Sequence, residues 1–123
     1  MKKFQDLDTF TVHDVEEALQ RNADDEISFV PLTIALGAND PAYAQQVCLK
    51  LAADLRPLVR GNALASLGHL ARRFRSLDEL PVRRVIEAGL IDTDEYVRIS
   101  AKSAADEIHQ FLGWTFQNHV YGI

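Results

Sequence analysis

Histidines are the side chains of this sequence best suited to chemistry near neutral pH, because imidazole binds metals and transfers protons there. The four are His13, His69, His109 and His119, and none has the spacing of a metal site such as HExxH or a cysteine partner. The single cysteine, Cys48, lies among apolar residues, which is typical of a buried thiol without a chemical role. The sequence therefore predicts no metal site and no cofactor.

Nucleophilic catalysis and nucleotide binding have no more support in the sequence. The serines stand in helical or capping contexts without a GxSxG elbow, and there is no Walker loop and no GxGxxG motif. One enzyme hypothesis remains, in which His69 acts together with Asn62 and Ser66 on one helix. Our prediction is a binding protein and not an enzyme.

Charge is distributed unevenly along the chain. Residues 1–40 carry a net charge of −6, residues 41–84 carry +5 and residues 85–123 carry −4, for a total of −5. An acidic chain favours a basic protein partner over nucleic acid, and the arginines of the middle third lack interleaved exposed aromatic side chains. We expect no direct contact with nucleic acid. The acidic cluster near the start comprises Asp6, Asp8, Asp14, Glu16, Glu17, Asp24, Asp25 and Glu26.

The composition is that of one ordinary globular domain. A chain of 123 residues with 47% hydrophobic and 25% charged residues is long enough to bury a core. No apolar run approaches the roughly 20 residues that cross a bilayer, and no apolar segment follows the two lysines near the start. We expect a cytoplasmic protein that does not bind membranes.

The stretch from Asp54 to Phe74 is the element that the rest of the chain must surround. Its apolar residues recur at intervals of three and four, which predicts a helix with one buried face: Leu58, Val59, Ala63, Leu67, Leu70, Ala71 and Phe74. A polar stripe is expected on the opposite side of this helix, formed by Asn62, Ser66, His69 and Arg73. Small residues such as Gly61 and Gly68 predict that another helix approaches closely.

This helix has a partial copy further along the chain. A shift of 38 residues places Asp54, Val59, Arg60 and Ala63 on Asp92, Val97, Arg98 and Ala101, Asp40 on Asp78, and Val47 on Val85. A period near 40 residues with two helices per unit is typical of stacked helical repeats.

At these positions the chain resembles the HEAT-repeat family. The family pattern D-x4-V-R-x2-A-x3-L-G is met at Asp54, Val59, Arg60, Ala63, Leu67 and Gly68, and the second copy departs from it at Ala105 and Asp106. The resemblance implies that Asp54, Arg60, Asp92 and Arg98 form a ladder that ties adjacent repeats together. It implies an all-α fold, a short right-handed α-solenoid of about six helices in three antiparallel HEAT-like pairs.

We expect a single domain over residues 1–123, divided into a degenerate first repeat at 11–37, a second at 40–74, a third at 78–112 and a C-terminal tail at 113–123. Thr11 and Asp40 are expected to cap helices, and so is Asp24 or Asp25. Pro31 is expected to delay or kink the second helix. The side chains expected inside that helix pair are Ile27, Phe29, Val30, Ile34 and Leu36. The tail residues Trp114 and Phe116 are expected to cover the open end of the last repeat.

Stacked helix pairs present a broad, rigid surface that suits binding of other proteins. In size, acidity and compact repeat fold the chain resembles the small bacterial immunity proteins of contact-dependent growth inhibition and related toxin systems. That resemblance implies a protein that binds a cognate toxin domain, a basic nuclease, and blocks its active site. The alternative is a general HEAT-repeat scaffold or adaptor, or a bilin-lyase-like protein with a pigment pocket lined by Tyr96, Trp114 and Tyr121. The sequence leaves the oligomeric state open.

Two sets of residues are the predicted partner contacts. The first is the concave stripe of the second helices, formed by Asn62, Ser66, His69, Arg73, Ser100 and Glu107. The second is the acidic part of the first repeat, formed by Glu16, Glu17, Asp24 and Asp25. An acidic surface of this kind complements a phosphate-binding cleft and accelerates association with it.

Overall fold

The structure, a computed structural model, describes residues 11–121. Over these residues the chain is helical without any strand, so the prediction of an all-α fold is confirmed. The elements are α1 (Val12–Arg21), α2 (Asp24–Ile27), α3 (Val30–Gly37), α4 (Pro41–Leu51), α5 (Pro57–Phe74), α6 (Glu79–Leu90) and α7 (Glu95–Leu112). None of these helices is both long enough and apolar enough to span a membrane.

Local capping signals set several helix ends as expected. The Thr11 side chain accepts a hydrogen bond from the amide of Asp14, and the Asp14 carboxylate accepts one from the Thr11 amide, which completes a capping box. Asn22 ends α1 in a left-handed conformation. Asp40 caps α4 ahead of Pro41, and Gly113 ends α7 with a φ of 77°.

The second expected helix is divided into α2 and α3. Its N-cap is Ala23, which makes no side-chain hydrogen bond, so the expectation that Asp24 or Asp25 caps it was wrong. Residues 28 and 29 separate the two pieces, and Pro31 lies in the first turn of α3. Proline lacks an amide hydrogen and fits only the first turn of a helix, so the late start of α3 has the cause that the sequence indicated.

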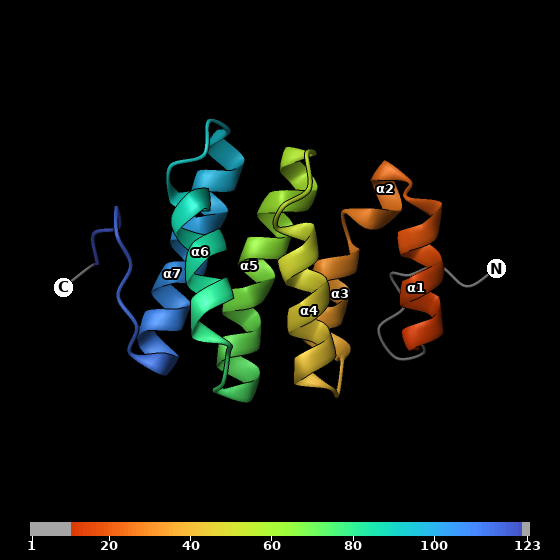
Figure 1. The fold of residues 1–123 in the computed structure, drawn as a ribbon, viewed down its shortest axis with the longest axis horizontal. Helices are drawn as coiled ribbons and strands as arrows, with labels where there is room; N and C mark the ends of the chain where they lie inside the picture. Colours follow the sequence, from red (N-terminus) through yellow and green to blue (C-terminus); the bar gives the residue numbers. More distant parts are fainter. Residues whose placement is uncertain (1–10, 122–123) are drawn as a thin grey trace.

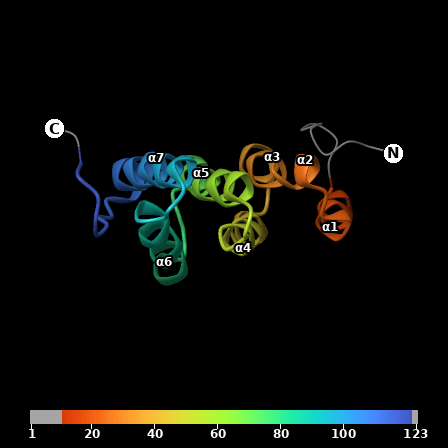
Figure 2. The ribbon, with the colours of Figure 1, turned by 90° about the horizontal axis from the view of Figure 1, so that it is seen from above.

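The helices lie in two layers. Figure 1 shows α3, α5 and α7 side by side, and Figure 2 shows α4 and α6 together on one side of that row. The contacts agree, because α5 packs against both α3 and α7, α4 packs on α3 and α5, and α6 packs on α5 and α7. Helix α1 lies at the N-terminal end of the row, and the C-terminal tail lies at the other end.

Helix α5 is the centre of the core. Ten of its residues are buried, including the apolar residues Val59, Ala63, Leu67, Leu70 and Ala71 of the predicted face. Leu58, predicted on the same face, is instead 52% exposed. The repeat is visible in burial as well, since Val59 and Ala63 and their counterparts 38 residues later, Val97 and Ala101, are all buried.

Glycines allow α5 and α7 to approach closely, as predicted. A Cβ atom on Gly68 would lie 3.0 Å from the Cα of Ala104, and one on Gly61 would lie 2.7 Å from the ring of Tyr96. Such distances are too short for ordinary contact, so the spacing of these two helices depends on the absence of both side chains.

The C-terminal tail covers the far end of the row. Phe116 is buried and Trp114 packs against the core cluster, as expected from the sequence. Arg83 of α6 donates to the Thr115 carbonyl oxygen and lies over the Phe116 ring, while the Gln117 amide donates to Glu87. The tail is therefore held to α6 by polar contacts as well as by its aromatic side chains.

Candidate protein-binding surface

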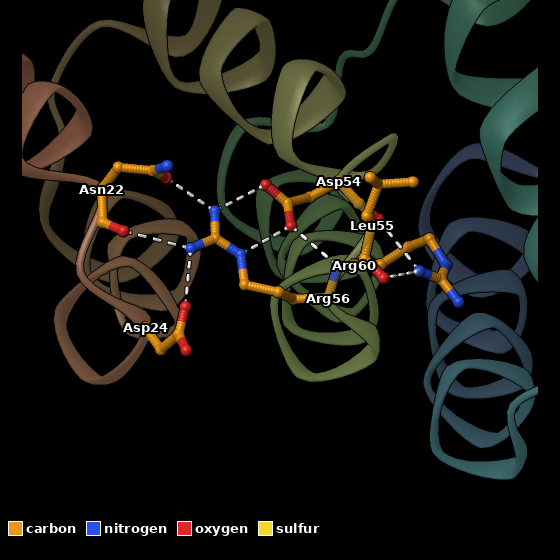
Figure 3. A network of polar contacts seen from close by, with 6 residues as sticks. All are labelled: Asn22, Asp24, Asp54, Leu55, Arg56 and Arg60. Carbon is orange, nitrogen blue, oxygen red and sulfur yellow. Dashed lines mark hydrogen bonds and ion pairs between the residues drawn. The ribbon is translucent and has the colours of Figure 1, made fainter.

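A ladder of arginines and carboxylates joins the loops that precede α2, α5 and α7. Arg56 donates to the carboxylate of Asp54 at 2.8 Å, to that of Asp24 at 2.9 Å and to both oxygens of Asn22 (Figure 3). These hydrogen bonds lower the pKa of Asp54 and connect the loop after α1 with the loop before α5.

The same contact recurs in the two repeat copies. The Nη1 atom of Arg60 donates to the Asp54 carbonyl oxygen at 2.9 Å, and that of Arg98 donates to the Asp92 carbonyl oxygen at 2.7 Å. Arg60 also grips both carboxylate oxygens of Asp92, and these hydrogen bonds lower the pKa of that carboxyl group. The predicted ladder is confirmed with one correction, because the carboxylate of Asp54 pairs with Arg56 rather than with Arg60.

Three of the predicted contact residues are buried inside the row of helices. Asn62, Ser66 and Ser100 are only 6%, 0% and 6% exposed, so the expectation that they line an open face was wrong. Asn62 donates to the Ser28 carbonyl oxygen at 2.8 Å and accepts a hydrogen bond from the Tyr96 hydroxyl. This string of polar groups links the start of α3 to α5 and α7. The Ser66 hydroxyl donates to the carbonyl oxygen of Asn62 one turn earlier.

The structure brings together two other members of the stripe, His69 and Glu107. The His69 Nδ1 atom lies 3.4 Å from a Glu107 oxygen, and the other Glu107 oxygen accepts from Arg72 at 2.9 Å. Nδ1 is buried without a hydrogen bond. Burial lowers the pKa of His69 and Arg72 lowers it further, while Glu107 opposes this shift. Arg73 remains exposed, although its guanidinium donates to the Ala35 carbonyl oxygen at 2.7 Å.

The acidic residues of the first repeat are all at the surface. Glu16, Glu17, Asp24 and Asp25 are exposed on α1 and α2. Glu16 accepts from the Tyr43 hydroxyl, while the side chain of Asp24 remains 87% exposed even though it pairs with Arg56. The other predicted members of this cluster at the start of the chain, Asp6 and Asp8, lie outside the described residues.

An apolar patch on the α3–α5–α7 face was missed by the sequence analysis. We define it as Phe29, Leu58, Tyr96 and Ile99, which are 45%, 52%, 45% and 55% exposed. The polar string brings three of them together, because Phe29 follows Ser28, Leu58 lies one turn before Asn62, and Tyr96 binds Asn62 directly. Ile99 lies one turn after Tyr96 on α7. The first three were expected in the interior, and Ile99 carried no separate signal.

The enzyme and pigment hypotheses gain nothing from this arrangement. Asn62 and Ser66 are engaged with backbone carbonyl oxygens, and no group of three metal-binding side chains occurs among residues 11–121. Tyr96 and His109 are separated by about 20 Å along α7 at 1.5 Å per residue. Because Trp114 and Tyr121 contact His109, the three aromatic residues do not line one pocket.

Comparisons with protein-family models, with curated proteins and with solved structures gave no match. The functional argument therefore depends on the residues and contacts described above.

Proposed function

We propose that this chain is a protein-binding immunity protein that neutralises a basic toxin domain, and that its two layers form a short right-handed α-solenoid of three antiparallel HEAT-like pairs. The α3–α5–α7 row supplies a rigid, continuous face, and α1 and α2 supply an acidic end. The partner is a nuclease whose phosphate-binding cleft is positively charged.

The acidic end carries this proposal. Residues 11–27 contain six carboxylates and one arginine, Arg21, which pairs with Glu26. The exposed carboxylates Glu16, Glu17, Asp24 and Asp25 lie close together in sequence and repel one another. A cationic partner offsets that repulsion, and complementary charge raises the rate of association.

The test is protection of a host from the toxin encoded beside this chain. Co-expression should restore growth, and the purified proteins should form a complex whose association rate falls steeply with added salt. The double variant Glu17→Gln/Asp25→Asn should slow association by roughly tenfold at low salt, since each change removes one exposed charge.

The control variant Gln110→Lys/Gln117→Lys changes the net charge equally at the other end of the molecule. It should leave the association rate near that of the wild type. Equal slowing in both variants would show a response to overall charge alone, and failure to find any growth-inhibiting neighbour would overturn the immunity function.

A further inference from the structure

The apolar patch has an acidic rim. Asp25 precedes Phe29 by four residues and Glu95 precedes Ile99 by four residues. Side chains four apart lie on one side of a helix, and residues 28 and 29 continue the helical conformation of α2. Each of these two apolar side chains therefore has a carboxylate next to it.

The cations at this edge are already engaged inside the molecule. Arg56 binds Asp54, Asp24 and Asn22, and Arg60 binds Asp92 and two carbonyl oxygens. By contrast, Asp25 and Glu95 have no ion pair within residues 11–121. Lys102, one turn beyond Ile99, marks the end of the acidic rim along α7.

The patch is broad enough to accept more than one side chain. Its members come from the start of α3, from α5 and from α7, which lie side by side (Figures 1 and 2). The Ser28–Asn62–Tyr96 string fixes these three elements relative to one another, so the patch is preformed. A preformed surface binds with less loss of conformational freedom than a mobile one.

We propose that the apolar patch binds a segment of the protein partner in which large apolar side chains are interspersed with lysine or arginine. This inference rests on the proposed function and adds to it the place and chemistry of the contact. The apolar side chains bury Phe29, Leu58, Tyr96 and Ile99, and the cations pair with Asp25 and Glu95.

A synthetic amphipathic peptide of leucine and lysine serves as the probe against the full chain. Titration calorimetry should detect binding, and the amide signals of residues 58, 96 and 99 should shift on titration. Leu58→Ser and Ile99→Ser should each raise the Kd by roughly tenfold, as expected for anchors at the centre of an interface. Leu80→Ser is the matched control, because Leu80 is 63% exposed on α6 in the other layer.

Each other outcome decides against this surface. Equal weakening by Leu80→Ser, or equal binding of a peptide with glutamate in place of lysine, would overturn the proposal. A dimer in sedimentation that Leu58→Ser dissociates would assign the patch to a second copy of the chain. Toxin binding that is insensitive to Leu58→Ser would overturn this inference alone, whereas patch-dependent peptide binding without any toxin protection would overturn only the immunity function.

Discussion

At the scale of single residues, His69 holds a polar atom in an unfavourable place. Its Nδ1 atom is buried without a hydrogen bond, 3.4 Å from an oxygen of Glu107. Burial and the neighbouring Arg72 lower the pKa of His69 below its usual 6.5, against the opposing charge of Glu107. The unfolded chain therefore takes up a proton more readily than the folded chain, so the free energy of unfolding falls as the pH drops through this range.

The variant His69→Gln removes this titrating group. Its free energy of unfolding, measured by urea denaturation, should depend less on pH between about 7.5 and 5 than that of the wild type. His13→Gln is the control, since the His13 ring is 81% exposed. An unchanged slope in His69→Gln would show that protonation of this ring is not coupled to folding.

Which arginine binds which carboxylate was only partly predictable from the sequence. The repeat identified Arg60 and Arg98 as equivalent, and their contacts with the carbonyl oxygens of Asp54 and Asp92 bear this out. The sequence could not separate Arg56 from Arg60 as the partner of Asp54, because both lie within reach of its side chain. Arg56 binds it because its guanidinium also reaches Asn22 and Asp24 across the loop, a contact between distant parts of the chain.

At the scale of elements, the position of α5 explains why part of the candidate site was misplaced. Periodicity marks one buried direction on a helix, and it correctly identified Ala63 and Leu67. However, α5 is flanked by α3 and α7 within its own layer, so side chains that point sideways are buried too. Asn62 and Ser66 lie there and meet backbone oxygens, while Leu58 remains outside. The pattern of a single helix contains no information about such lateral neighbours.

Gly68 tests the close approach of α5 and α7. Gly68→Ala should destabilise the fold by about 1–2 kcal/mol, because overpacking against the Ala104 backbone outweighs the roughly 1 kcal/mol that alanine gains in helix propensity. Urea denaturation measures the change. Ser103→Ala, at an exposed position of α7, is the control and should be neutral or slightly stabilising. A more stable Gly68→Ala variant would show that the two helices separate without cost.

At the scale of the whole molecule, a row of helices has two ends that must be closed. The layers and the 38-residue period were predictable because they depend on residues that recur, such as Val59 and Val97. The closure of the far end was predictable in kind, since apolar residues after Gly113 have nowhere else to be buried. The polar contacts that fix the tail, such as that between His119 and Asp106 at 2.7 Å, depend on the folded geometry and had no sequence signal.

Phe116 is the residue on which closure of this end depends most directly. It is 6% exposed, and Phe116→Ala should lower the free energy of unfolding by about 2 kcal/mol, less than the 3–5 kcal/mol of a central core position. The cost is limited because the tail can detach as a unit once its anchor is lost. Detachment would expose the apolar sides of α6 and α7, so the variant should also self-associate in sedimentation velocity. Val120→Ala, at a side chain that is 91% exposed, should do neither. If Phe116→Ala behaved like Val120→Ala, the tail would not be what closes this end of the row.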